Sequence, residues 1–263
     1  MQHSALLNVM IAAARKASRT LKRDFGEVEN LQVSLKGPGN FVTAADRKAE
    51  ETLKAELAKA RPGYSFLGEE SGSHAGTDTT HTWIVDPLDG TTNFLHGIPQ
   101  FAISIGLERS GTIVAGVIYN PITDELFVAE RGKGAFLNDK RLRVAARKRL
   151  ADSVIACGLP HLGRGDLDLG LRELSAVQDK VAGLRRFGAA ALDMAFVAAG
   201  RLDGYWERNI SPWDIAAGII ILREAGGFVT DIDGADAMFT KKHVVAGNET
   251  IQRELQTLLK AAS

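Results

Sequence analysis

The stretch Trp83–Phe94, WIVDPLDGTTNF, joins an apolar run to two carboxylates, a glycine and two threonines. The apolar residues before Asp86 predict a buried strand. Pro87 fixes its own φ angle and restricts Asp86 to an extended conformation, so the turn that carries both acids is stiff. Gly90 and the two threonines are expected to open a helix, whose free N–H groups favour an anion such as phosphate. We therefore expect the carboxylates to hold a cation and the following turn to hold phosphate.

Further acids occupy comparable positions, where an apolar run meets a turn or the start of a helix. They are Glu69 and Glu70 in GEES and Asp214 in PWDIAAG. Oxygen ligands without a nearby histidine or cysteine favour Mg²⁺ or Mn²⁺ over zinc. Several convergent carboxylates repel one another unless cations lie between them. Asp86 is predicted to bridge two ions and Asp89 to reach one.

Each acid also has an ordinary explanation when it is taken alone. Asp86 is a strand-end residue, Asp89 a helix N-cap and Asp214 a first-turn acid. Asp46, three residues after the predicted N-cap Thr43, fits a capping box. Glu69 and Glu70 fit a solvated turn. Only the joint pattern favours a metal site.

The composition limits the classes of partner. The chain has 263 residues with 32 basic and 32 acidic side chains, so its formal charge of zero predicts no nucleic-acid or membrane surface. No run approaches the roughly 20 apolar residues of a membrane span. The N-terminal segment has the spacing of an amphipathic helix that ends at Gly26, rather than of a targeting segment. We predict a soluble, cytoplasmic protein in which the single cysteine, Cys157, is a buried structural thiol.

The two halves of the chain have different patterns. Short β-rich runs (AISIGLE, TIVAGVIYN, ELFVAE) predict an antiparallel meander in the first half. In the second half, strands alternate with helices, one of them over about 168–182. We predict an α+β lobe over 1–145 that carries most metal ligands, and an α/β lobe over 146–263 that supplies Asp214 and substrate contacts, in one compact body.

Three motifs in order (GEES, WIVDPLDGTTNF and WDIAAGIIILREAGG) resemble the inositol monophosphatase family. The resemblance extends from about Lys36 to the terminal helix. It implies a mixed α+β fold, a five-layer αβαβα sandwich, in a homodimer. It further implies Mg²⁺-dependent, lithium-sensitive hydrolysis of small phosphate monoesters, with two to three Mg²⁺ ions per site and Mn²⁺ as a substitute.

The resemblance also assigns roles to residues of this chain. It implies a first metal on Glu69, Asp86 and the Leu88 carbonyl, a second on Asp86, Asp89 and Asp214, and a weaker third on Glu69. Gly90 and Thr91 are implied to bind phosphate through backbone N–H groups. The Thr91 hydroxyl, paired with Asp46, is implied to orient the attacking water. Glu70 is expected to lie next to the metal ligands without binding the metal itself. Ions about 4 Å apart would clamp the phosphate, activate water and stabilise the leaving alkoxide.

Substrate choice rests on fewer residues. The family's acid seven residues before the last metal ligand corresponds to Glu207, and the turn before the next helix reads Gly188-Ala189-Ala190. Together with Asp89 these residues are predicted to contact the substrate. Ala189 lacks the hydroxyl that the family often has there, and Asn40 replaces a frequent aspartate. Inositol 1-phosphate is the first expectation. These departures bear on substrate preference more than on catalysis.

Several alternatives stay open. FVTDIDGAD resembles the signature of haloacid dehalogenase-type phosphatases, but Ala235 follows its glycine and a turn explains it better. Fructose-1,6-bisphosphatase, nucleotide 3'-phosphatase and histidinol phosphatase activities use the same metal core, although TTNFLHG resembles the inositol monophosphatase branch. An interaction protein with an incidental phosphatase core is a further alternative. The basic segment AARKRLADS and Arg185-Arg186 are interpreted as solvated faces or a dimer edge.

Overall fold

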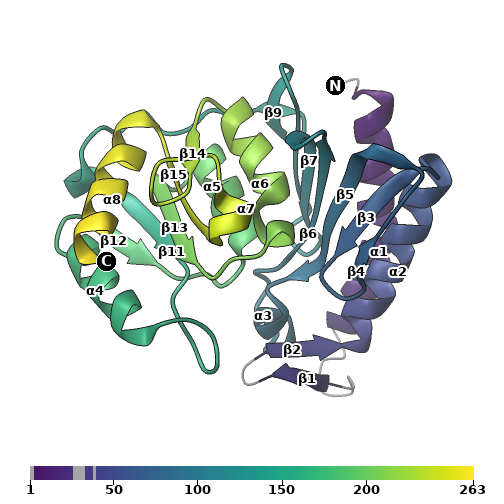
Figure 1. Cartoon of the computed structure of the whole chain (residues 1–263), viewed down its shortest axis with the longest axis horizontal. Helices are drawn as coiled ribbons and strands as arrows, with labels where there is room; N and C mark the ends of the chain where they lie inside the picture. The colour runs from purple at the N-terminus through teal and green to yellow at the C-terminus, as the bar shows by residue number, and fades with distance from the viewer. Residues whose placement is uncertain (1–2, 26–32, 38–39) are drawn as a thin grey trace.

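The computed structural model describes residues 3–25, 33–37 and 40–263, and it stacks helices and sheets in five alternating layers (Figure 1). In order, the layers are a helix pair, an eight-stranded sheet, a second helix pair, a five-stranded sheet and a third helix pair. This is the mixed αβαβα sandwich that the sequence predicts, so the predicted fold class is confirmed.

The first helix pair covers the outer face of the larger sheet. α1 (Ala5–Phe25) and α2 (Ala44–Ala60) each present an apolar side to it, with Leu21 and Leu53 fully buried. This burial follows from the helical spacing of the apolar residues. Among the helices of the described residues, none is long and apolar enough to cross a membrane.

The eight-stranded sheet brings the opening motif to the interior of the molecule. In spatial order its strands are β10 (Lys140–Arg141), β9 (Gly134–Leu137), β8 (Glu125–Glu130), β7 (Thr112–Asn120), β6 (Ala102–Arg109), β5 (Asp78–Asp89), β3 (Tyr64–Gly68) and β4 (Gly72–His74). All neighbours are antiparallel except β3 and β5. The predicted meander of β6, β7 and β8 is confirmed. β5 ends with Asp86 and Asp89.

The middle helices are buried between the two sheets. α5 (Ala190–Ala198) and α6 (Pro212–Glu224) lie side by side and are apolar on nearly all sides. A helix of this kind belongs in the interior. Glycines on the sheet let α6 approach closely: a Cβ on Gly116 would lie 2.8 Å from the Ala217 carbonyl oxygen.

The five-stranded sheet and the last helix pair form the remaining layers. In spatial order the strands are β12 (Gly183–Arg185), β11 (Val154–Cys157), β13 (Gly204–Arg208), β15 (His243–Gly247) and β14 (Phe228–Thr230). β11 runs parallel to both β12 and β13, and the other pairs are antiparallel. α4 (Leu167–Gln178) and α8 (Glu249–Ala262) cover its outer face, where Trp206 and Leu255 are buried.

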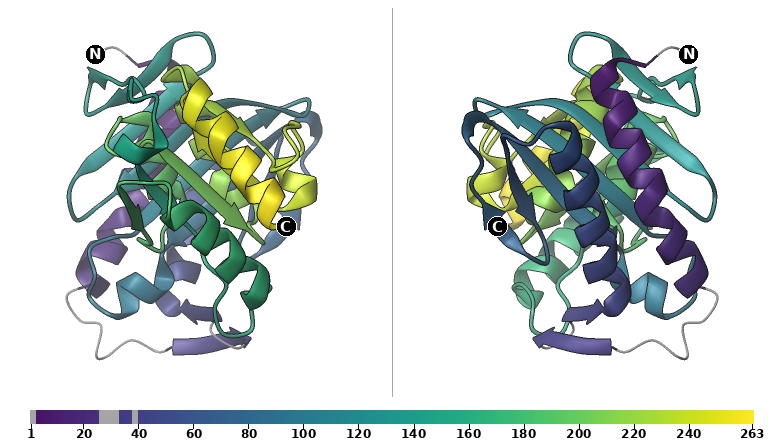
Figure 2. Two further views of the ribbon diagram at one scale, coloured as in Figure 1. Left: turned by 90° about the vertical axis from the view of Figure 1, so that its left-hand side faces the viewer. Right: turned by 90° about the vertical axis from the view of Figure 1, so that its right-hand side faces the viewer.

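Shorter elements complete the fold. They are the antiparallel hairpin of β1 (Val33–Gly37) and β2 (Asn40–Thr43), α3 (Thr91–Leu95), α7 (Met238–Lys241) and a 3₁₀ turn over Leu150–Asp152. Figure 2 shows the hairpin at one end of the molecule, and β2 contacts α3. Glycine and proline in this stretch favour a loop, so the sequence carries little signal for the two-strand pairing. The side chains of Lys36, Asn40 and Thr43 lie outside the described residues.

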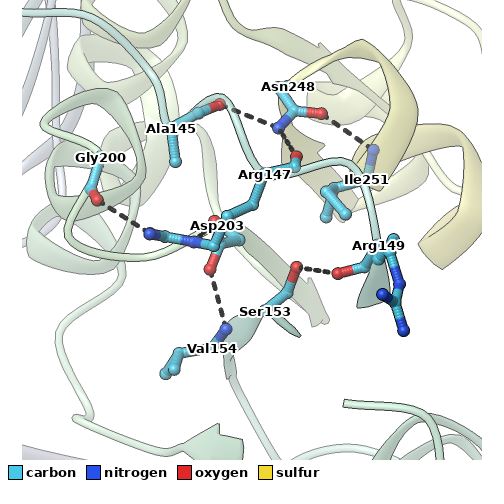
Figure 3. A network of polar contacts seen from close by, with 9 residues as sticks. All are labelled: Ala145, Arg147, Arg149, Ser153, Val154, Gly200, Asp203, Asn248 and Ile251. Atoms are coloured by element: carbon cyan, nitrogen blue, oxygen red, sulfur yellow. Dashed lines mark hydrogen bonds and ion pairs between the residues drawn. The ribbon is translucent and has the colours of Figure 1, made fainter. Parts of the chain in front are cut away.

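The basic segment after β10 is fixed to the second sheet (Figure 3). Arg147 Nε donates to Asp203 Oδ1 over 2.6 Å, and the Val154 N–H donates to Asp203 Oδ2 over 2.8 Å. Asn248 Nδ2 donates to the Ala145 and Arg147 carbonyls while its Oδ1 caps α8. Arg147 therefore compensates a buried acid and is more than a solvated charge. The predicted lobe boundary between 145 and 146 falls in this segment and stays a prediction.

One secondary-structure prediction needs correction, and three short elements were not predicted. The helix predicted over 168–182 ends at Gln178, because residues 183–185 form β12 beside β11. The chain has to reverse before that strand, and the Lys180 N–H donates to the Val177 carbonyl in the reversal. The short elements β4, β12 and α7 were not predicted, since runs of three or four residues carry little periodic signal.

Candidate active site

A cavity lies where the end of β5, the start of α3 and the N-termini of α5 and α6 converge. Its volume is about 140 Å³, which suits a small molecule. Its lining residues are Glu69, Asp86, Leu88, Asp89, Gly90, Thr91, Thr92, Cys157, Gly158, His161, Arg164, Arg186, Gly188, Ala190, Asp193, Glu207 and Asp214. The cavity therefore brings the four predicted metal-ligating carboxylates together with the predicted phosphate turn and Glu207.

A bulge at the end of β5 presents Asp86 and Asp89 to this cavity. Asp86 pairs with Ser104 of β6 and Asp89 with Ala102, so β5 has one residue more than its partner strand between these pairs. The Leu88 N–H donates to Asp86 Oδ1 over 2.9 Å and fixes that carboxylate within the bulge. Bulges re-aim side chains in this way. The stiff turn predicted around Pro87 is thus a bulge in the strand.

Glu69 is held by a side chain that the sequence analysis did not single out. It lies in the turn after β3, and Glu50 of α2 accepts hydrogen bonds from the next two N–H groups, those of Glu70 and Ser71, each over 2.8 Å. Glu50 is 3% exposed. A buried carboxylate with two backbone donors fixes a turn firmly. Glu70 does not line the cavity, and its N–H is one of the two donors.

Asp214 occupies the first turn of α6, as the sequence predicted. The Ser211 N–H donates to Asp214 Oδ2 over 2.8 Å, and Pro212 stands at the first helical position. Arg164 Nη2 lies 3.8 Å from the same oxygen. These contacts hold the carboxylate of Asp214 at the cavity. Asp214 is therefore both an ordinary first-turn acid of α6 and a lining residue of the cavity.

The carboxylates strongly disfavour one another's charge. Burial raises the pKa of Asp86, and the charges of Glu69, Asp89 and Asp214 raise it further. Burial and then Asp214 raise the pKa of Asp89. Burial and, to a lesser degree, Glu69 raise the pKa of Asp214 to about 7, although the Ser211 N–H opposes the rise. Cations between these three acids and Glu69 would relieve this repulsion.

The donor set fits a hard divalent cation. Within residues 3–25, 33–37 and 40–263, no three His, Cys, Asp or Glu side chains are already arranged as a metal site. The hydrogen bonds from Leu88 and Ser211 use one oxygen each of Asp86 and Asp214, and one oxygen of Asp89 accepts from the Ala191 N–H over 2.7 Å. All the predicted ligand atoms are oxygens, with no nitrogen or sulfur, and such a set suits Mg²⁺ or Mn²⁺.

The turn after β5 offers backbone donors on the other side of the cavity. Gly90 caps α3 in the left-handed conformation, with φ 94°. That conformation favours glycine, and an added Cβ would also lie 2.9 Å from the Gln100 carbonyl oxygen. The Thr91 hydroxyl directs its one proton toward Asp46 Oδ1 and the Leu88 carbonyl oxygen, each 3.1 Å from Oγ1. Asp46 is fully buried in the first turn of α2, so the structure joins it to Thr91 although it does not line the cavity.

Glu207 forms the far wall of the cavity. The Tyr205 hydroxyl donates to Glu207 Oε2, and burial is the main cause that raises the pKa of Glu207. Gly158 makes room for this carboxylate, because a Cβ there would lie 2.0 Å from Glu207 Cδ. A glycine at this position thus lets an acid reach the cavity from the next strand.

The Gly188-Ala189-Ala190 turn is only partly exposed to the cavity. Gly188 and Ala190 line it, whereas Ala189 is 1% exposed and packs in the central core as the N-cap of α5. The missing hydroxyl at Ala189 therefore removes nothing from the lining itself. Asn93 Nδ2 donates to the Phe187 and Gln100 carbonyls, each over 2.7 Å, and ties this turn to α3.

Several lining residues were not predicted as site residues. They are Cys157, Gly158, His161, Arg164, Arg186 and Asp193. One sequence signal was present: Asp193 is the only acid within the apolar run of α5. Arg186 was interpreted as a solvated or dimer residue. Cys157 is buried as predicted, and burial raises its pKa to about 12, which makes it a poor nucleophile.

The second aspartate-rich motif, FVTDIDGAD, forms a turn. Asp231 Oδ1 accepts from the Ala235 N–H over 2.8 Å, and the Gly234 N–H donates to the Asp231 carbonyl. Asp231 is fully buried and does not line the cavity. The predicted turn is confirmed, and this aspartate is not presented as a nucleophile.

Known proteins resemble this chain over nearly its whole length. A family model described as the inositol monophosphatase family matches residues 2–263. The inositol-1-monophosphatase of Mesorhizobium japonicum is 65% identical over 99% of this chain and 98% of its own length. The crystal structure of the extragenic suppressor protein suhB from Bartonella henselae has a TM-score of 0.95 and 62% identity, covering 98% of this chain and 99% of that one. The Nus factor SuhB of Pseudomonas aeruginosa is 41% identical over 97% of this chain and 95% of its own.

Proposed function

This chain belongs to the inositol monophosphatase family and is therefore a phosphatase, and we propose that it catalyses the Mg²⁺-dependent hydrolysis of myo-inositol 1-phosphate to inositol and phosphate. One observation carries the proposal: a single cavity joins four carboxylates, the backbone donors at the start of α3, and an acidic wall at Glu207. This combination offers places for cations, for a phosphate and for a hydroxylated leaving group.

The carboxylates are the proposed metal ligands. Glu69, Asp86 and the Leu88 carbonyl would hold a first Mg²⁺, and Asp86, Asp89 and Asp214 a second, with a weaker third on Glu69. The raised pKa values of Asp86, Asp89 and Asp214 support this assignment, because a divalent cation relieves the repulsion that raises them. Bound Mg²⁺ would supply positive charge that neutralises the phosphate and makes a bound water more acidic.

The turn at the start of α3 is the proposed phosphate site. The N–H groups of Gly90 and Thr91 lie at a helix start, where an anion is favoured. The single proton of the Thr91 hydroxyl is directed to Asp46 Oδ1 and the Leu88 carbonyl, so the lone pairs of Oγ1 remain to accept a hydrogen bond from an attacking water and to orient it. Asp46 thus fixes the direction of the Thr91 hydroxyl. Holding the reactants in line accounts for much of the acceleration in phosphoryl transfer.

The leaving group is proposed to lie against Glu207 and the Gly188-Ala190 turn. The buried carboxylate of Glu207 accepts from Tyr205, which holds it in place. The proposed substrate contacts are completed by Asp89 Oδ1 and by backbone groups of the turn Gly188, Ala189 and Ala190. Other sugar or nucleotide phosphates compete with inositol 1-phosphate for this assignment, since they would use the same metal and phosphate groups.

Phosphate release from a panel of esters tests the proposal. The panel holds inositol 1-phosphate, fructose 1,6-bisphosphate, adenosine 3',5'-bisphosphate and histidinol phosphate, each with Mg²⁺ and with a chelator. We expect Mg²⁺-dependent turnover of inositol 1-phosphate that Asp89→Asn abolishes. Preference for another ester would overturn inositol 1-phosphate as the proposed substrate, while metal-dependent phosphate hydrolysis would remain the proposed reaction. No turnover of any ester would overturn the enzymatic proposal.

A role as an interaction protein is the second candidate, because relatives at 41% identity are named Nus factor SuhB. The two functions separate in a cell that carries Asp89→Asn. A phenotype that survives loss of hydrolysis would favour interaction, and one that is lost with it would favour catalysis.

Three further properties are proposed on the basis of the family. The protein is proposed to be a cytoplasmic homodimer whose activity lithium inhibits. Light scattering after gel filtration tests the dimer, and a lithium titration of phosphate release at fixed Mg²⁺ tests the inhibition.

A further inference from the structure

An acid with an unpaired carboxylate oxygen lies on the wall of the cavity. Asp193 belongs to the first turns of α5 and is 2% exposed, yet it lines the cavity together with Glu207 and Cys157. Its Oδ1 is buried and accepts no hydrogen bond from any described residue. Buried carboxylate oxygens are rarely left in this state, because the lost hydration is costly.

The fold itself does not use this carboxylate. The Ala191 N–H, at the start of α5, donates to Asp89 Oδ2 over 2.7 Å and not to Asp193. The Asp193 N–H makes the ordinary helical bond to the Ala189 carbonyl over 3.0 Å. The side chain therefore neither caps α5 nor pairs with a neighbouring strand. An alanine or leucine would serve the packing of this apolar helix better.

The neighbours of Asp193 define what its free oxygen can accept. Glu207 and Asp89 lie close enough that their charges raise its pKa after burial does, and Arg186 opposes them. A negatively charged ligand group beside Asp193 is disfavoured, whereas an uncharged hydrogen-bond donor is favoured. Glu207 already accepts from the Tyr205 hydroxyl, so Asp193 is the less satisfied of the two acids. A hydroxyl group on a bound molecule matches this requirement.

We propose that Asp193 is a specificity-determining residue that accepts a hydrogen bond from a hydroxyl of the substrate's leaving group. This inference rests on the proposed function, because it places the alcohol part of the phosphate ester between α5 and Glu207. Asp193 and Glu207 then offer two acceptors on one wall, which selects polyhydroxylated esters over esters without hydroxyls. A site built around unpaired polar groups discriminates strongly against a ligand that lacks the matching hydroxyl.

The test compares two esters in two variants. The esters are inositol 1-phosphate, which carries ring hydroxyls, and phenyl phosphate, which carries none. Asp193→Leu keeps the approximate size of the side chain and removes both oxygens, and Asp193→Asn keeps one acceptor. Asp168→Leu, an exposed acid on α4, is the matched control for loss of charge. Circular dichroism and the Tm show whether each variant is folded.

We expect Asp193→Leu to lower kcat/KM for inositol 1-phosphate relative to phenyl phosphate about ten-fold or more, chiefly through KM. Asp193→Asn should lose less, and Asp168→Leu should leave the ratio unchanged. An unchanged ratio in folded Asp193→Leu and Asp193→Asn, or an equal loss on both esters, would overturn the inference while the wild type still hydrolyses inositol 1-phosphate. A wild type that hydrolyses neither ester would instead overturn the proposed function.

Discussion

At the scale of single residues, Glu50 illustrates how a side chain outside the cavity controls one inside it. Its two oxygens accept from the N–H groups of Glu70 and Ser71. The turn that carries Glu69 therefore depends on a carboxylate from another element. A neutral replacement has an amide group where a second acceptor is needed.

Glu50→Gln is expected to weaken both folding and metal binding. One buried N–H would lose its acceptor, which lowers the free energy of unfolding by about 1–3 kcal/mol. The displaced Glu69 turn should raise the Mg²⁺ concentration needed for half-maximal activity. Urea denaturation and a Mg²⁺ titration of phosphate release measure the two effects. Glu51→Gln, the same change at the exposed neighbouring position, is the control, and equal behaviour of both variants would contradict the role of Glu50.

His243 is expected to make stability depend on pH. Its Nδ1 accepts from the Ile232 N–H over 3.0 Å, which requires an unprotonated nitrogen. Burial and then the charge of Arg208 hold the pKa of His243 below its usual 6.5. The folded state thus binds this proton less readily than the unfolded state. The stability that neutral His243 contributes is fully present at pH values above its pKa in the unfolded state. It is lost as the pH falls through the pKa of His243 in the folded state.

His243→Asn removes the titrating group while its amide oxygen keeps an acceptor near the position of Nδ1. Between about pH 8 and about pH 5, the wild type should lose more stability than this variant. Urea denaturation at both pH values measures the difference. Parallel losses in the two proteins would show that another group causes the pH dependence.

At the scale of elements, the close approach of α6 to the larger sheet depends on glycines of β6 and β7. A Cβ on Gly116 would lie 2.8 Å from the Ala217 carbonyl oxygen and 3.0 Å from its Cα. These are backbone atoms of a buried helix, so neither side can move without shifting the whole element. The first turn of α6 carries Asp214, and its distance from Asp86 depends on this packing.

Gly116→Ala is therefore expected to lower the free energy of unfolding by about 1–3 kcal/mol, the usual cost of overpacking a core. It should also reduce activity, because Asp214 moves with α6. Thermal unfolding and phosphate release measure both. Gly183→Ala is the matched control, since its nearest neighbour is the mobile end of Arg185 at 3.2 Å. A Tm for Gly116→Ala equal to that of Gly183→Ala would rule out the tight contact.

At the scale of the whole molecule, the cavity exists only where parts of both sheets meet. Asn93 makes one of the links, since its Nδ2 donates to the carbonyl of Gln100, which follows α3, and to the carbonyl of Phe187, which precedes α5. It is 8% exposed, so water does not readily replace these bonds. α3 and the turn before α5 are held in register by one side chain.

Asn93→Ala should leave two carbonyls without a donor and lower the free energy of unfolding by about 1–3 kcal/mol. It should also raise KM for the phosphate ester, because the turn at Gly90 loses its support. Steady-state kinetics and urea denaturation measure these changes. Asn8→Ala, at an exposed position of α1, is the control. Wild-type KM in Asn93→Ala would contradict a link between the two sides.

The sequence by itself determined the features that depend on neighbours along the chain. Apolar spacing identified α1, because a helix buries residues at a fixed local period. The stretch around Pro87 identified a rigid turn with two acids before a helix start. The types of ligand in that turn already favoured a hard cation.

Only the tertiary structure decided which distant groups share the cavity. Glu50, Arg186 and Asp193 are separated from the opening motif by tens of residues or more, and no local pattern shows where they point. Their positions depend on how α2 packs on the first sheet and how α5 packs beside α6. Such packing is the sum of many weak contacts, each of which depends on the rest of the fold.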